Sequence, residues 1–178
     1  MADYTGSGVL PQRTGPYFSF LAPYGMFQAR DREFYLGCST DAMWTRLCTE
    51  LGWSELMADP RFKTGGDRAR NQAQLYEILV PRFKERNAAE WVALATKLVI
   101  PTSLIQNLSE VVVQEQALAR EAVIPVMGVE KVRSSGIPIK LNRTPGTVRL
   151  GPPRVGEHTD QALASAGYDA DAIAALRA

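Results

Sequence analysis

The stretch that decides the fold is residues 25–52, GMFQARDREFYLGCSTDAMWTRLCTELG. It opens with two short runs of β-prone residues, 25–29 and 33–39, on either side of the charged turn Arg30-Asp31-Arg32. Two such runs joined by a tight connection predict a β-hairpin.

The second part of this stretch predicts a helix. Ser39 or Thr40 can cap its first turn, which carries Asp41. Apolar residues then recur at three- and four-residue spacing as far as Gly52, a residue type that commonly ends helices. A hairpin followed directly by a helix indicates a domain that combines both kinds of structure.

Two further helices are expected downstream. The Pro and paired Gly of DPRFKTGGD (59–67) predict a loop, with a second helix starting at Asp67 and kinked or ended by Pro81. Asn87 precedes a third helix, Ala88–Leu98, with Glu90 placed as in a capping box. These helices would cover a sheet.

The remaining regular segments are shorter. Residues 99–105 predict a buried strand, and a helix is expected from about Ser109 to Arg120. Residues 124–132 and 137–141 resemble two strands on either side of a Ser-Ser-Gly turn.

Both ends of the chain have the composition of linkers. Residues 1–23 contain glycines and prolines, Pro11 among them, and show no apolar periodicity, and residues 143–156 are equally irregular. We therefore expect an α+β fold: an extended arm (1–23), a small α+β domain (24–142), and a return arm with C-terminal helices (143–178).

Composition limits the classes of function. The chain has 178 residues, 46% of them hydrophobic, and a net charge of +1 without a basic run, which disfavours nucleic acid as a partner. No apolar stretch approaches the roughly 20 residues that cross a bilayer. The two cysteines lack metal-site spacing and the start lacks the apolar core of a secretory signal, so we expect a cytoplasmic protein with free thiols and no membrane contact.

The residues alone present no catalytic constellation. His158, the only histidine, has no companions for a metal site and no nucleophile beside it, so we interpret it as the start of a last helix. Gly65-Gly66 fits either a loop that binds phosphate at the start of a helix or an ordinary loop without a ligand. Arg68 and Asn71 suit either anion binding or anchoring of a loop, and Asp59 favours a turn.

Aromatic residues in the first arm suggest contact with another surface. Phe18, Phe20 and Tyr24 would be exposed there unless they dock on a partner or fold back on the same core. Up to this point the sequence indicates an α+β domain with two docking arms.

Several segments, in order, resemble one family. They are APYGMFQARDREFYLGCSTDAMWTRLCTELGW, DPRF with Arg68 and Asn71 after it, AAEWVALATKLVIPTSLIQNLSEVVVQEQALAR, IPIKLNRTPG and PPRVGEHT. From about residue 14 to the end the chain is similar to the C-terminal half of the class III CoA-transferases, which include formyl-CoA transferase, carnitine CoA-transferase and α-methylacyl-CoA racemase.

The resemblance implies that the catalytic residues lie in a different half of the enzyme from this chain. Members of the family open with a CoA-binding half, in which an aspartate forms an anhydride with the carboxylate and then takes CoA as a thioester, whereas racemases use a His/Asp pair. The resemblance therefore implies acyl-CoA and carboxylates as substrates, no further cofactor, no catalytic residue in this chain, and a partner half. Two chains of the family interlock, which implies a homo-oligomer.

The resemblance also singles out four residues for substrate binding. The glycine-rich loop of formyl-CoA transferase corresponds to about 14–25 here, where Gly15 and Gly25 are the glycines and Tyr24 lies beside the second. Asp41 stands where racemases carry an acidic residue, although it also suits the first turn of a helix. Transferase and racemase both stay open, as does a non-catalytic interaction domain with the same fold.

Overall fold

The structure is a computed structural model that describes residues 2–10 and 13–177. Met1, Pro11 and Gln12 of the predicted arm lie outside the described residues, as does Ala178. The chain separates into two compact units, residues 1–105 and 106–178. The expected domain 24–142 spans this division, and its bounds stay a prediction.

The first unit contains a three-stranded antiparallel sheet and most of the helices. In chain order its elements are α1 (Ala2–Ser7), β1 (Tyr24–Gln28), β2 (Glu33–Gly37), α2 (Asp41–Leu51), α3 (Ser54–Ala58), the 3-10 helix η1 (Pro60–Phe62), α4 (Gly65–Arg70), α5 (Gln72–Phe83), α6 (Ala88–Lys97) and β3 (Thr102–Leu104). The strand order is β1-β2-β3. The predicted hairpin is confirmed, with Tyr24 opposite Gly37 and Gln28 opposite Glu33.

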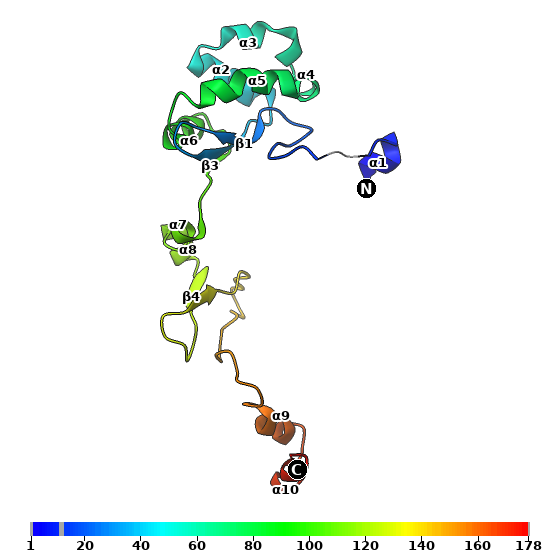
Figure 1. Cartoon of the computed structure of the whole chain (residues 1–178), viewed down its shortest axis with the longest axis vertical. Helices are drawn as coiled ribbons and strands as arrows, with labels where there is room; N and C mark the ends of the chain where they lie inside the picture. The colour runs from blue at the N-terminus through cyan, green and yellow to red at the C-terminus, as the bar shows by residue number, and fades with distance from the viewer. Residues whose placement is uncertain (1, 11–12, 178) are drawn as a thin grey trace. The chain divides into compact units, whose positions relative to one another are not determined.

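One face of the sheet is covered and the other is open. Phe27, Phe34 and Leu36 share the buried face, as the period of two along a strand requires. Tyr24 and Tyr35 lie on the opposite face and are half-buried. Helices α2 to α5 gather on one side of the strands (Figure 1). The first unit thus has two layers.

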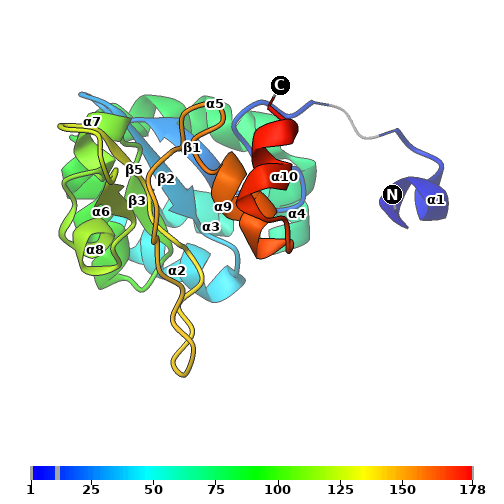
Figure 2. The same cartoon turned by 90° about the horizontal axis from the view of Figure 1, so that it is seen from below.

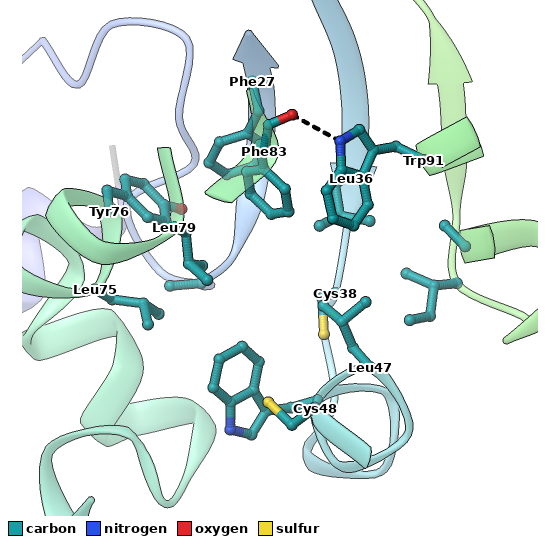
Figure 3. Packing of buried hydrophobic residues seen from close by; sticks show 14 of the residues in the cluster. Phe27, Leu36, Cys38, Leu47, Cys48, Leu75, Tyr76, Leu79, Phe83 and Trp91 are labelled. Carbon is teal, nitrogen blue, oxygen red and sulfur yellow. Dashed lines mark hydrogen bonds between the residues drawn. The ribbon is translucent and has the colours of Figure 1, made fainter. Parts of the chain in front are cut away.

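Aromatic rings dominate the core between these layers. The Phe83 ring lies edge-on to Phe34 and to Trp91, with centroids 5.4 and 5.1 Å away. The indole Nε1 of Trp91 donates a 2.7 Å hydrogen bond to the Phe83 carbonyl, so the polar atom of this buried ring is satisfied (Figure 3). Truncating such a ring costs about 3–5 kcal/mol.

The predicted ends of two helices are confirmed. The Thr40 hydroxyl accepts a hydrogen bond from the Met43 amide at the start of α2, and Gly52 ends that helix with φ +68°. At α6, Asn87 and Glu90 form the expected capping box, in which the Glu90 carboxylate accepts from the Asn87 amide. The capping residues in the local sequence were sufficient to predict these helix ends.

The second predicted helix differs from its prediction. It begins at Gly65, two residues earlier than expected, because Thr64 caps it and Asp67 closes a capping box. The helix is interrupted at Asn71, and α5 then runs through Pro81 and ends at Phe83. Pro81 therefore precedes the end of the helix by two residues.

The prediction of a buried strand over 99–105 is wrong. Only Thr102–Leu104 form β3, and this is an edge strand with Ser103 exposed. The amides of Val99 and Ile100 instead bond to carbonyls of the last turn of α6. These two residues finish a helix and are not available to a strand.

The second unit is made of short elements: α7 (Leu108–Val111), α8 (Glu115–Ala119), β4 (Val123–Pro125), β5 (Arg133–Ser135), α9 (Thr159–Ser165) and α10 (Ala170–Ala175). Helices α9 and α10 lie next to each other (Figure 2). Residues 143–156 contain neither helix nor strand, as predicted for the return arm.

Three predictions in this unit are wrong. The first strand, expected over 124–132, is only Val123–Pro125. The helix expected over 109–120 is split, since Asn107 and Gln114 each begin a separate helix. The second strand is Arg133–Ser135 and not 137–141, so the serines of the expected Ser-Ser-Gly turn pair with β4 instead. Pro138, which has no amide hydrogen, weakens 137–141 as a strand.

Candidate functional site

The candidate residues Tyr24 and Gly25 lie at one end of the sheet. There β1 begins at Tyr24, β2 ends at Gly37 and β3 begins at Thr102. A Cβ atom added to Gly37 would lie 3.2 Å from the Pro101 Cβ and 3.4 Å from the Tyr24 ring. A glycine at position 37 therefore lets the tyrosine and the proline close over the strand end.

Gly25 is required by the backbone around it. Its φ is +149°, and an added Cβ would lie 2.5 Å from the Pro16 carbonyl oxygen. That carbonyl accepts from the Met26 amide, and the Phe18 amide donates to the Tyr24 carbonyl, so residues 16–18 pair with β1. Gly25 permits this close approach of two backbones.

Gly15 occupies a different environment. It has φ +65°, and nothing lies within 4 Å of the position of an added Cβ. The Thr14 hydroxyl donates to the Tyr17 carbonyl across this turn at 2.7 Å. Gly15 therefore turns the chain ahead of Tyr17 and is not brought against Tyr24.

Two tyrosines form the open face beside this strand end. Tyr24 and Tyr35 are in edge-to-face contact, with ring centroids 5.6 Å apart. Burial, together with the neighbouring Tyr24 hydroxyl, raises the pKa of Tyr35 to about 12. At neutral pH the Tyr35 phenol is therefore a neutral hydrogen-bonding group.

The first arm folds back on this unit from residue 13 onward, one of the two outcomes considered for its aromatic residues. The Gln72 side-chain amide donates to the carbonyls of Phe18 (2.8 Å) and Leu21 (3.2 Å). The Tyr24 amide donates to the Tyr76 hydroxyl at 3.1 Å. The rings of Phe18 and Phe20 nevertheless stay 46% and 60% exposed. By contrast, Ala2–Ser7 form the helix α1, so the arm is not extended throughout.

Asp41 is connected to the same strand end through Arg68. The Asp41 carboxylate, at the first turn of α2, accepts from Arg68 Nη2 at 2.9 Å. The buried Arg68 guanidinium also donates to the carbonyls of Ala22 (2.8 Å) and Phe62 (3.3 Å) and lies over the Trp44 ring. Arg68 thus holds Asp41 and the residues just before Tyr24 in one network.

The anchoring interpretation of Arg68 and Asn71 is supported by their partners. The Asn71 side-chain amide donates to the Arg61 and Asp67 carbonyls, which ties the loop before α4 to the helix. Sequence reasoning did not find that Arg68 reaches back to Ala22, or that Gln72 and Tyr76 hold the first arm. These contacts join residues about 50 positions apart, so no pattern in the local sequence indicates them.

The other chemical candidates have structural roles. His158 precedes α9, as expected, and its side chain makes no capping hydrogen bond. The carboxylate of Asp67 accepts the Thr64 amide and hydroxyl at the start of α4, which places a negative charge where a phosphate would bind beside Gly65. Asp59 caps η1 and pairs with Arg61.

The two cysteine thiols are buried and unreactive at neutral pH. Burial raises the pKa of both Cys38 and Cys48 to about 12, so neither is a thiolate at neutral pH. Figure 3 shows both in the core. Among residues 2–10 and 13–177 no group of three or more His, Cys, Asp or Glu side chains is arranged to hold a metal ion. No helix in this described part is long and apolar enough to cross a membrane.

Comparison with known proteins places this site in context. The family model described as CoA-transferase family III matches residues 1–159. An acyl-CoA transferase of Fusarium pseudograminearum is 33% identical over 171 residues, which cover 94% of this chain and 38% of that protein. An acetyl-CoA:oxalate CoA-transferase of Acetobacter aceti is 30% identical over 139 residues, or 78% of this chain and 35% of that protein.

A solved structure agrees with the fold. The CAIB/BAIF family protein from Brucella suis is 29% identical and superposes with a TM-score of 0.73 over 92% of this chain and 43% of its own. The chain therefore spans about two fifths of the length of the relatives that it matches. On the extent of the family match and on this likeness, the chain belongs to CoA-transferase family III.

Proposed function

We propose that this chain is the C-terminal part of a class III CoA-transferase and completes the acyl-CoA site of a catalytic half that it does not itself contain. Tyr24 and Gly25 would form one wall of that site, with Asp41 and the turn at Gly15 at its edge. The family match and the fraction of each relative that is covered support this proposal.

The observation that carries the proposal is the state of the reactive groups. The Asp41 carboxylate is held by Arg68, the Cys38 and Cys48 thiols are protonated, and His158 stands alone at a helix start. Covalent catalysis requires a nucleophile with an activating neighbour. None of these four groups has an activating neighbour among the described residues, so the chemistry is assigned to the other half.

The reaction class follows from the relatives. Both curated relatives described above are named as transferases, which favours CoA transfer over racemisation. The proposed substrates are an acyl-CoA and an acceptor carboxylate, with CoA as a substrate and not as a resident cofactor. We place this reaction in the cytoplasm.

The exposed aromatic rings support an assembly. Phe18 and Phe20 contact each other edge to face, with centroids 5.7 Å apart, while the backbone beneath Phe18 is fixed by Gln72. Rings held on a fixed backbone lose little conformational entropy on binding, which suits them to an interface. We propose that they are covered when copies of the complete enzyme, this chain together with its catalytic half, form a homo-oligomer.

A reconstitution assay tests the function. CoA exchange between an acyl-CoA and a carboxylate is measured with the chain alone, and again after addition of the CoA-binding half of a family member. We expect turnover only in the mixture. Turnover by the isolated chain would mean that it contains a nucleophile, whereas tight binding of the half without turnover would favour the non-catalytic interaction domain.

A further inference from the structure

The second unit, residues 106–178, has almost no core of its own. Among its described residues Ile173 alone is buried, whereas the hydrophobic core cluster of the chain lies within residues 22–100. Ordering each residue costs conformational entropy, which the burial of apolar surface has to offset. One buried side chain cannot offset the ordering of a whole unit, so this unit needs a surface outside itself.

Part of this unit carries positive charge that no acidic residue balances locally. Residues 131–154, which we call the basic segment, contain no Asp or Glu and six cations, which are Lys131, Arg133, Lys140, Arg143, Arg149 and Arg154. Lys140 pairs with Glu121 at 2.9 Å, and none of the other five cations forms an ion pair with a described residue. Because the whole chain has a net charge of only +1, its positive charge is concentrated in this segment.

Apolar side chains alternate with these cations and are also exposed. They are Val132, Ile139, Leu141, Val148 and Leu150, among which Ile139 is 67% and Leu150 63% exposed. A polyanion such as a nucleic acid would make use of the cations alone. Exposed apolar side chains interleaved with arginines are typical of a surface that binds another protein.

Two shallow hollows lie along the same segment. Their volumes are about 300 and 290 Å³, and Ile124, Pro125, Met127 and Val148 line both. In a protein interface, side chains that anchor one partner fill pockets of this kind on the other. The basic segment therefore presents apolar hollows beside unpaired positive charges.

The occupant that fits this surface is the part of the enzyme outside the chain. The Brucella suis structure superposes over 92% of this chain, which includes most of the second unit, and more than half of its own chain lies outside the match. The second unit thus has a fold that also occurs within a larger protein. A second copy of the chain fits less well, because a symmetric contact between two basic segments brings like charges together.

We propose that the basic segment docks on an acidic and apolar face of the CoA-binding half, and that residues 106–178 become stably ordered only in that complex. The proposal rests on the proposed function. It adds which part of the chain holds the other half and by what chemistry. Because salt screens interactions between exposed charges, the association is expected to weaken as the salt concentration rises.

The test uses the full chain and the CoA-binding half of the Fusarium pseudograminearum relative. Amide hydrogen exchange is followed by mass spectrometry for the chain alone and with the half added. We expect protection of residues 22–104 in both samples, and a gain of at least about tenfold in residues 106–177 only with the half present. The dissociation constant should rise at least about tenfold when NaCl is raised from about 50 to about 500 mM.

Two charge-reversal variants locate the docking surface. Arg143→Glu combined with Arg149→Glu changes exposed side chains outside any helix or strand, and we expect about a hundredfold weaker association. Lys63→Glu combined with Lys84→Glu makes the same change of charge on exposed residues of the first unit, and the dissociation constant should stay unchanged. Protection of residues 22–104 verifies that both variants are folded.

Four results would overturn the proposal. They are protection of residues 106–177 in the chain alone, no gain of protection when the half is added, equal protection by vesicles of anionic lipid, and unchanged association in the Arg143/Arg149 variant. Protection that rises with the concentration of the chain alone would assign the surface to a second copy and overturn it as well. CoA transfer in the mixture tests the proposed function separately, since turnover without protection of residues 106–177 rejects only the docking surface.

Discussion

Arg68 and Asp41 form an ion pair whose two ends lie in different environments. The Arg68 side chain is 1% exposed and the Asp41 side chain 61%, with 2.9 Å between Nη2 and Oδ1. The buried Arg68 guanidinium donates to three acceptors, which are the carbonyls of Ala22 and Phe62 and the Asp41 carboxylate. These hydrogen bonds compensate for the water that the guanidinium loses on burial. The carboxylate end remains open to a ligand.

Replacing Arg68 tests this arrangement. In Arg68→Met the carbonyls of Ala22 and Phe62 lose their shared donor, and we expect the free energy of unfolding to fall by about 3 kcal/mol in a urea titration. Asp41→Asn should lower it by about 1 kcal/mol or less, because its end of the pair is exposed. Equal losses in the two variants would contradict the account.

The two candidate glycines, Gly15 of the first arm and Gly25 of β1, give a second prediction. Gly25→Ala places a methyl group against the Pro16 carbonyl, and we expect a loss of about 3 kcal/mol with faster amide exchange at Met26. Gly15→Ala meets only open space and should cost about 1 kcal/mol from its backbone angle. If Met26 stayed protected in Gly25→Ala, the pairing of residues 16–18 with β1 would not depend on Gly25.

Val99 follows the end of α6 and Gly52 the end of α2, both with left-handed backbone (φ +54° and +68°), and substitutions at the two positions are expected to have unequal effects. Gly52→Val should lower stability by about 1–2 kcal/mol, since a branched residue is forced into a left-handed conformation. Val99→Gly should not lower it, because relief of the strain offsets the greater freedom of glycine in the unfolded chain. Thermal denaturation of both variants measures this, and a clear loss of stability in Val99→Gly would show that Val99 is not strained.

The buried thiols predict alkaline sensitivity. The pKa of Cys38 and of Cys48 is raised to about 12 in the folded chain, against roughly 8.5 when unfolded. Their contribution is therefore full below about pH 8.5 and is lost as pH rises towards 12. We expect the urea midpoint to fall over this window, and to fall less steeply when both cysteines are alanine. An unchanged slope in that variant would assign the effect to other groups.

Replacement of His158 is expected to have only a small effect on stability. It begins α9 without a side-chain capping bond, so His158→Ala should change stability by about 1 kcal/mol or less. Turnover of the reconstituted enzyme should be unaffected. A loss of turnover by orders of magnitude in a folded variant would make His158 catalytic.

Local signals account for the parts of the fold that the sequence predicted. The hairpin follows from two β-prone runs, and the starts of α2 and α6 from capping residues at Thr40 and Asn87. Each depends on residues within one turn of each other. For that reason these elements are found without knowledge of the rest of the chain.

The errors occur where tertiary contacts or several caps compete. Val99 and Ile100 have β propensity, but the end of α6 takes their amides, which shortens the strand. Asn107 and Gln114 both start helices, which divides a stretch that shows one periodicity. At the candidate site, the link from Arg68 to Ala22 spans 46 residues and depends on the folded chain.

The most direct test of the central claim is intact-mass analysis of the reconstituted enzyme, quenched during turnover with an acyl-CoA and a carboxylate. If the nucleophile belongs to the CoA-binding half, CoA is found there as a thioester of a carboxyl side chain, and this chain keeps the mass of its sequence. A covalent CoA or acyl adduct on this chain, mapped to Asp41 or to any other residue, would contradict the account.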